Sequence, residues 1–529
     1  MSAKLVKGKT MGDSRTKNST RNAVVSISFY VVYTIMSFVL RKIFIVTLGN
    51  DYLSVSGLFT NILTVLSFAE LGIGEAIIFN LYKPIAFGDT EKIKSLMALY
   101  KKAYMIIGTV IFGVGVALIP FLSYLISNEA PDIRESITLL YVLYLFNTSV
   151  SYFFSFKQAI ITANQKNYIV SAFTNTFRIA QMVFQGVFLY LTHNFLVYLL
   201  IQISFTVINN VTIAFKADKV FPYLKDKNVT PIEKGERKSI FKNVKALMLY
   251  KVGSTLLNGT DNIIITKVIA LSSVGLVSNF NMIVVAVSAV IDQIPKAVVA
   301  SVGNLNATGD REKKYKIFKV LLFMCSWIYG FCASGIYFFA NDFVSLAFGS
   351  EWVLDPIVIF SIVLQFYVSS VHSPCYTYRT TLGYFVQGRW TPLIASVINI
   401  SLSIIFGKIM GLAGVFFATS IARVCAYGIV DSHLIYKNCF EKKQVMYFLR
   451  YGVYFGAAFL IAMLSGWIVS FITLGGIVGF IIKLAVYCVV YNAAALAVSF
   501  KTPEFKYLKK AFAQNLLKKL SHKSVKENI

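Results

Sequence analysis

Residues 48–92 read LGNDYLSVSGLFTNILTVLSFAELGIGEAIIFNLYKPIAFGDTEK. The apolar run at 53–82 is long enough for a membrane helix, because about 20 residues span the roughly 30 Å hydrocarbon core of a bilayer. Glu70 lies near the middle of this run. A charge at that depth is costly, so a charged residue there usually has a functional role. The stretch therefore predicts a membrane helix that carries a polar group inside the protein.

The same pattern continues along the whole chain of 529 residues, of which 57% are hydrophobic. Soluble domains contain about 45–50% apolar residues and rarely grow to this length around one core. We therefore expect an all-α polytopic membrane protein with about fourteen transmembrane helices. The expected spans lie near residues 23–47, 53–82, 97–122, 136–161, 168–191, 195–216, 246–269, 273–298, 317–340, 357–382, 392–409, 412–436, 447–472 and 476–500.

Two short motifs of the opening stretch recur in the second half of the chain. GLFTN at 57–61 returns as GLVSN at 275–279, which is 218 residues later. AFGDTEK at 86–92 returns as ATGDREK at 307–313, which is 221 residues later. The order and the nearly constant offset indicate an internal repeat, and an even number of spans separates the two copies. The pattern predicts two parallel six-helix lobes followed by a C-terminal helix pair, with a substrate site between the lobes.

Polar segments set the expected domain boundaries. Basic residues gather in the N-terminal segment, in a central linker and in the tail, and the chain has 51 Lys and Arg against 24 Asp and Glu. The positive-inside rule then places both termini in the cytoplasm. The excess of positive charge favours contact with anionic membrane lipids rather than with nucleic acid. The expected segments are 1–22 (N-terminus), 23–216 (first lobe), 217–245 (linker), 246–436 (second lobe), 437–500 (helix pair) and 501–529 (tail).

Six charges inside expected spans are candidate site residues, and all of them except Lys251 lie at depths from which a side chain cannot easily reach water. Four are cations, and a cationic interior suits an anionic substrate because arginine binds phosphate through paired donors. The two acids could bind a coupling proton or sodium ion, or could pair with cations of the other lobe. The sequence leaves both readings open, and it predicts no metal site and no cofactor. The cations are Arg41, Arg178, Lys251 and Arg423, and the acids are Glu70 and Asp261.

Three further cations, Lys157, Lys296 and Arg379, lie nearer the ends of their spans. We expect them to extend their charged groups to the membrane interface, as long basic side chains commonly do. Asp292 precedes Lys296 by four residues, so the two would share one helix face and could form a structural pair.

The run LG-x-x-YL-x-x-x-GLF-x-N-IL followed by AELGIG resembles the polysaccharide exporters, the Wzx-like oligosaccharide flippases. They form a family within the multidrug/oligosaccharidyl-lipid/polysaccharide (MOP) superfamily. The resemblance implies a V-shaped, MATE/MOP-like fold with an alternating-access cavity, in a bacterial plasma membrane. The implied substrate is an oligosaccharide linked to undecaprenyl diphosphate, flipped to the outer leaflet to build capsule, exopolysaccharide or a related polymer. A polysaccharide polymerase or glycosyltransferases would be its partners.

On this resemblance, the four candidate cations would hold the diphosphate or acidic sugars. The protein would be a transporter and not an enzyme.

Three alternatives remain open. A drug/cation antiporter of the same superfamily would usually have twelve spans and an anionic interior. A flippase for the peptidoglycan precursor, lipid II, would share both the fold and the prenyl diphosphate. A membrane glycosyltransferase or polymerase would need a large outer loop or a soluble catalytic domain, whereas no expected outer loop here exceeds about twenty residues.

Overall fold

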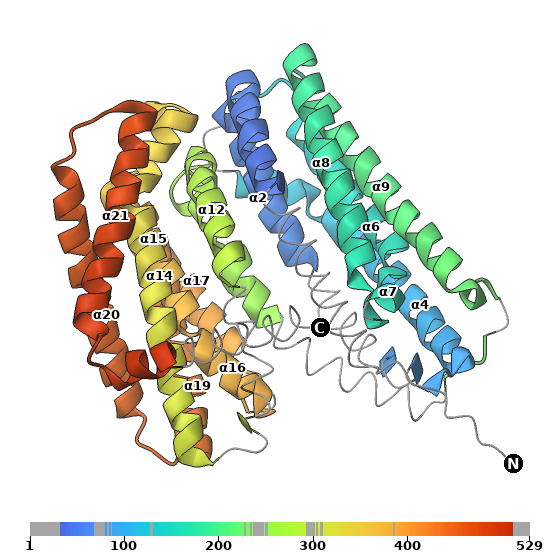
Figure 1. The fold of residues 1–529 in the computed structure, drawn as a ribbon. Coiled ribbons are helices and arrows are strands. Elements are labelled where there is room, and N and C mark those ends of the chain that lie inside the picture. The colour runs from blue at the N-terminus through green and yellow to red at the C-terminus, as the bar shows by residue number, and fades with distance from the viewer. Residues whose placement is uncertain are drawn as a thin grey trace, which may run out of the picture. The chain divides into compact units, whose positions relative to one another are not determined.

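The computed structural model describes residues 32–67, 80–81, 84–85, 87–126, 131–164, 166–226, 229–232, 235, 248, 252–292, 302, 305–306, 310–384 and 387–510. All regular secondary structure in these residues is helical (Figure 1). The chain divides into two compact units, Met1–Gly275 and Leu276–Ile529. Helix α12 crosses the boundary between them, and each unit is described by itself.

The first unit is a helical bundle in which α6 packs against α2, α4 and α9, and α8 packs along α9. A short helix, α11, packs against α2 and α5. The elements are a helix at 32–48, α2 (Asn50–Leu66), α4 (Thr90–Ala117), η2 (Ile119–Phe121), α5 (Leu122–Leu125), α6 (Ile137–Ser155), α7 (Gln158–Ala163), α8 (Asn167–Thr192), α9 (Phe195–Val220), η3 (Pro222–Lys225), α11 (Asp261–Val268) and the start of α12 (Ser272–Ile291).

The second unit is arranged around a long helix, α14, which packs against α15, α20 and α21. Helices α17 and α18 form the other closely packed pair, and α18 also contacts α15. The remaining elements are α14 (Arg311–Ala347), η4 (Ser350–Trp352), α15 (Pro356–Val371), α16 (Ser373–Thr381), α17 (Thr391–Met410), α18 (Leu412–Arg423), the π-helical η5 (Val424–Gly428), α19 (Ile429–Ile435), the π-helical η6 (Tyr436–Phe440), α20 (Val445–Ser470), α21 (Gly476–Ser499) and a helix at 503–510.

Ten helices of the described chain are long and apolar enough to cross a membrane, and each coincides with an expected span. The expected spans at 23–47, 53–82 and 246–269 each extend into residues outside the described ranges. The span at 168–191 corresponds to α8, which has 26 residues but carries Asn175, Arg178, Gln181 and Gln185. The predicted class, an all-helical polytopic membrane protein, is therefore confirmed.

The repeated GD-x-EK motif has the same structural role in both copies. Asp89 Oδ1 accepts a hydrogen bond of 2.9 Å from the backbone N–H of Lys92, and so caps α4. Asp310 Oδ1 accepts one of 2.7 Å from the backbone N–H of Lys313, and so caps α14. The first N–H groups of a helix lack partners inside the helix, and a carboxylate there also offsets the helix dipole. The repeat thus starts one long membrane helix in each unit.

The repeated glycines allow α2 and the start of α12 to approach closely within the first unit. A Cβ atom at Gly57 would lie 2.8 Å from Val274 Cγ1, and one at Gly275 would lie 1.9 Å from Asn50 Oδ1. The backbone N–H of Gly275 donates to Ser54 Oγ over 3.1 Å, and Asn50 Nδ2 donates to the Ser272 carbonyl over 3.1 Å. Side chains of α2 therefore satisfy polar backbone groups at the start of α12.

We predict that Gly275→Val destabilises the protein, because its side chain would overlap Asn50 and displace these hydrogen bonds. Overpacking of this kind typically costs about 1–3 kcal/mol. The measurement is the melting temperature and the monodisperse fraction of the detergent-purified protein. Gly113→Val on α4 is the matched control, because nothing lies within 4 Å of a Cβ placed there. Equal behaviour of the two variants would contradict this account of the α2–α12 contact.

Candidate functional site

Arg41 lies on the helix at 32–48, where it is partly buried. Its electrostatic neighbours are Tyr144 on α6 and Tyr198 on α9. The ring of Phe44, one turn along the helix, stands edge-on to Tyr198 with 5.3 Å between ring centroids. The packing of three helices therefore places a partly buried guanidinium near phenol groups.

Arg178 lies on α8 and is exposed. Its guanidinium carbon stands 5.9 Å from the ring centroid of Tyr33, which is a cation–π distance. Tyr198 lies near enough to Arg41 and to Tyr33 for their charges to influence one another. Arg41 and Arg178 thus each lie near members of one group of tyrosines, Tyr33, Tyr144 and Tyr198, which we call the tyrosine cluster.

The tyrosine cluster has the chemistry of an anion site. Each guanidinium offers a planar set of N–H donors, and each phenol can donate one further hydrogen bond. Hydrogen bonds and charge interactions are stronger where water is partly excluded. The sequence pointed to the arginines by their depth in apolar runs, but it contained no signal that would select these tyrosines from the chain's 30.

Asp261 is buried at the first position of α11. A carboxylate at that position is favoured by the partial positive charge of the helix N-terminus. Lys267, in the last turn of the same helix, donates a hydrogen bond of 2.9 Å to the carbonyl of Tyr124 and stands 3.7 Å from the centroid of its ring. Two other predicted site residues, Glu70 and Lys251, lie outside the described residues.

In the second unit, Arg423 ends α18 immediately before a π-helical turn and is partly buried. Among the described residues of this unit, the most buried charged cluster lies further along the same continuous helix, at Asp431. Its Oδ1 accepts a hydrogen bond of 2.9 Å from Arg379 Nη1, and its Oδ2 lies 2.9 Å from His372 Nε2. Asp431 is fully buried and Arg379 is only 2% exposed.

Breaks in regular helix geometry assemble this cluster. His372 occupies the junction between α15 and α16, and Pro374, the second residue of α16, has no N–H to donate in the first turn. Asp431 lies in α19, between the two π-helical segments η5 and η6, which each shift the helix register. A Cβ atom at Gly388 would lie 2.6 Å from Arg379 Nη1, so the missing side chain leaves room for the guanidinium.

Arg379 therefore does not reach the membrane interface as we expected, because a buried carboxylate holds it. Lys157 is partly exposed, and its Nζ lies 2.6 Å from Oδ2 of Asp218 in the last turn of α9, so its extension to the membrane interface stays a prediction. Lys296, the expected partner of Asp292, lies outside the described residues. The expected pair therefore stays a prediction, and Asp292 Oδ1 accepts a hydrogen bond of 2.7 Å from the hydroxyl of Tyr329.

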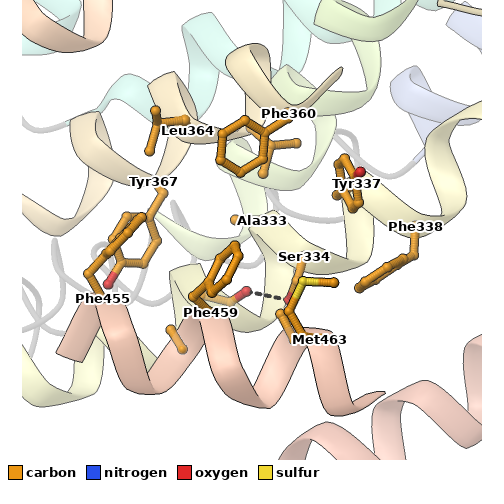
Figure 2. A pocket seen from close by; sticks show the side chains of 14 residues that line it. Ala333, Ser334, Tyr337, Phe338, Phe360, Leu364, Tyr367, Phe455, Phe459 and Met463 are labelled. Atoms are coloured by element: carbon orange, nitrogen blue, oxygen red, sulfur yellow. Dashed lines mark hydrogen bonds between the residues drawn. The ribbon is translucent and has the colours of Figure 1, made fainter. Parts of the chain in front are cut away.

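An apolar groove of about 260 Å³ lies between α14, α15 and α20 (Figure 2). Aromatic rings from all three helices line it, and the hydroxyls of Ser334, Tyr337 and Tyr367 are the polar side-chain groups along it. Such a groove between membrane helices suits a hydrocarbon chain. Its principal lining residues are Ala333, Phe338, Phe360, Phe455, Phe459 and Met463.

No three His, Cys, Asp or Glu side chains come together as a metal site within the described ranges. The charged residues that are buried within the described ranges are Lys94, Asp261, Arg379, Asp431 and Glu504.

No protein-family model and no curated protein matches the chain. Solved structures match it in fold. One is the lipid II flippase MurJ in an inward closed conformation, with a TM-score of 0.62 and 15% identity, covering 90% of this chain and 98% of that one. Another is an inward-facing multidrug resistance MATE family transporter of the MOP superfamily, with a TM-score of 0.56 and 14% identity, covering 77% of this chain and 96% of that one.

A third match is a mutant of the Vibrio cholerae MATE transporter VcmN, with a TM-score of 0.54 and 14% identity, covering 81% of this chain and all of that one. Identities this low show a shared fold. The expected MOP-like architecture is thus confirmed, and the likeness to MurJ extends over more of this chain than the two likenesses to MATE transporters.

We predict that Asp431→Asn lowers the free energy of unfolding by about 3 kcal/mol, because it leaves the buried guanidinium of Arg379 without a countercharge. The double variant Asp431→Asn/Arg379→Gln should recover part of the loss, which a double-mutant cycle would measure. Thermal melting of the purified protein in detergent is the readout, with Asp342→Asn as an exposed control. Additive losses in the double variant would show that the two residues are not coupled.

Proposed function

We propose that this protein is a flippase of the MOP superfamily for a lipid-linked oligosaccharide carried on undecaprenyl diphosphate. It would move its substrate from the inner to the outer leaflet of a bacterial plasma membrane by alternating access, with both termini in the cytoplasm. The flipped units would serve the synthesis of capsule, exopolysaccharide or a related surface polymer. The observation that carries this proposal is the placement of Arg41 and Arg178 around one tyrosine cluster.

A diphosphate is the substrate group that best matches this placement. It offers several oxygen acceptors and two or more negative charges, which one guanidinium cannot satisfy alone. Two arginines with phenol donors between them can share such a group. A cationic drug, by contrast, would be repelled by both arginines, so the cluster argues against the drug/cation antiporter.

The apolar groove of the second unit supports the lipid part of the proposal. A prenyl chain must remain in an apolar environment while its headgroup crosses, since each buried CH₂ contributes about 0.8 kcal/mol. Phenyl and phenol rings from α14, α15 and α20 provide such an environment (Figure 2). A prenyl chain would fit such an environment.

A lipid II flippase is the second candidate, because the MurJ match covers 90% of this chain. Both candidates use a prenyl diphosphate, so the tyrosine cluster does not separate them. The resemblance of residues 48–92 to oligosaccharide flippases favours the first.

Glu70 and Asp261 are proposed to couple transport to a proton or sodium ion, or to pair with cations during the cycle.

We predict that Arg41→Ala and Arg178→Ala each impair export at least tenfold while the protein remains in the membrane. The reason is that each variant removes donors for the diphosphate, and a tenfold change corresponds to only about 1.4 kcal/mol. The measurement is mass spectrometry of prenyl-diphosphate oligosaccharides extracted from cells that express each variant in place of the native protein. Lys101→Ala, an exposed cation on α4, is the matched control.

The mass of the accumulated lipid distinguishes the two candidates. Accumulation of a non-peptidoglycan repeat unit would support the proposed substrate, whereas accumulation of lipid II would identify the second candidate. An unchanged lipid pool, with new sensitivity to cationic compounds, would overturn both in favour of an antiporter.

We also predict that Ala462→Trp slows export, because an indole at this position would fill the apolar groove. Leu460→Trp adds an indole on the same helix at a position that is 69% exposed and outside the groove lining, so it should be neutral. The same lipid analysis reports the result. Equal export by both variants would exclude the groove from the transport route.

A further inference from the structure

Helix α14 extends beyond the membrane. Its 37 residues rise about 55 Å at 1.5 Å per residue, whereas the hydrocarbon core is about 30 Å thick. The first turns carry Arg311, Glu312, Lys313, Lys314, Lys316 and Lys319. This end of the helix therefore lies at the level of the lipid headgroups and beyond.

Three cations surround one aromatic ring at this level. The Nζ of Lys442 is 4.8 Å, the Nζ of Lys319 is 5.1 Å and the guanidinium carbon of Arg450 is 5.5 Å from the ring centroid of Tyr315. Nearby, the Nζ of Lys316 stands 5.3 Å from the ring of Tyr507 on the helix at 503–510. Like charges gathered so closely repel one another unless an anion joins them.

The carboxylates of this region do not balance these cations. Glu312 lies 2.8 Å from Lys442, and Glu504 lies 3.4 Å from Arg450. The third acid, Asp310, caps α14 as described above. Within the described residues, neither Lys316 nor Lys319 forms an ion pair. The lining of the cavity described below has three lysines (Lys313, Lys316 and Lys319) and three carboxylates. Lys442 and Arg450 lie beside the lining and pair with two of those carboxylates, so the lining and these two flanking cations together have a net charge of +2.

A cavity of about 510 Å³ opens among these side chains, between the first turns of α14 and the helix at 503–510. We propose that this cavity binds the headgroup of an acidic phospholipid. The ammonium groups of Lys316 and Lys319 would donate to the phosphate, while the rings of Tyr507 and Tyr315 orient them. The site is separate from the transported substrate and would hold α14, α20 and the helix at 503–510 together at the membrane surface.

The mixed lining also predicts which headgroup is preferred. Carboxylates at the cavity can accept hydrogen bonds from the hydroxyls of a glycerol headgroup, while the net positive charge disfavours a zwitterionic lipid. Phosphatidylglycerol combines one phosphate with two hydroxyls, so it fits better than phosphatidylethanolamine or phosphatidylcholine. Inorganic phosphate in solution offers the same kind of oxygen acceptors to the lysines, so the experiment must distinguish binding of phosphate from binding of lipid.

The test is native mass spectrometry of the full-length protein in detergent, titrated with phosphatidylglycerol, phosphatidylethanolamine or phosphatidylcholine. We expect preferential retention of phosphatidylglycerol. The double variant Lys316→Gln/Lys319→Gln should lose about tenfold or more in affinity, because it removes two positive charges that attract an anionic headgroup. Lys316→Arg/Lys319→Arg keeps the charges and should retain the lipid. Lys101→Gln/Lys102→Gln, on exposed positions of α4, should leave binding unchanged.

Several results would overturn the proposal. Equal retention by the native protein and the glutamine variant would exclude the two lysines from a lipid site. Equal retention of phosphatidylethanolamine would remove the argument from net charge. Full displacement of the lipid by millimolar inorganic phosphate alone would assign the site to a soluble anion. If the glutamine variant does not fold, Tyr507→Leu, which removes the ring beneath Lys316, provides the second test and should also weaken retention.

Discussion

The need to satisfy polar groups away from water is the constraint on which this structure depends. In hydrocarbon, each unsatisfied backbone or side-chain group costs several kcal/mol, so the chain spans the membrane as helices and its interior charges have partners. Asp431 is the clearest case, because one fully buried carboxylate receives both Arg379 and His372. Tyr487 follows the same rule by donating its hydroxyl to the Phe331 carbonyl over 2.6 Å.

Aromatic rings are a second kind of partner for charge in this protein. Arg178 lies over Tyr33, Lys267 over Tyr124 and Lys319 over Tyr315. A ring attracts a cation without neutralising it, so the cation keeps its capacity to bind an anion. A carboxylate partner, as for Arg379, instead consumes that capacity. This difference separates two kinds of charged residue described above: Arg178 stands beside a tyrosine ring, whereas Arg379 is paired with a buried aspartate.

The internal repeat places the same short sequence pattern in both units, where it caps a helix in each. Asp89 and Asp310 cap the two helices that follow the repeated motif, and this capping depends only on residues three positions apart. The repeated glycines act over a longer range, because Gly57 and Gly275 remove side chains where α2 and the start of α12 approach each other. The first property could be predicted from the motif alone, whereas the second requires the packing of distant segments.

The sequence by itself determined the class of this protein: apolar runs of membrane length, helix starts marked by aspartate, and arginines at depths where charge is unusual. These features are local, since hydropathy and capping depend on neighbouring residues. Only the tertiary structure decided the partners. Arg379 forms an ion pair with Asp431, which is 52 residues away in the chain, and Lys157 forms one with Asp218, which is 61 residues away. Whether a cation binds a carboxylate or remains available beside a ring depends on which helices pack together, and no periodicity along the chain contains that information.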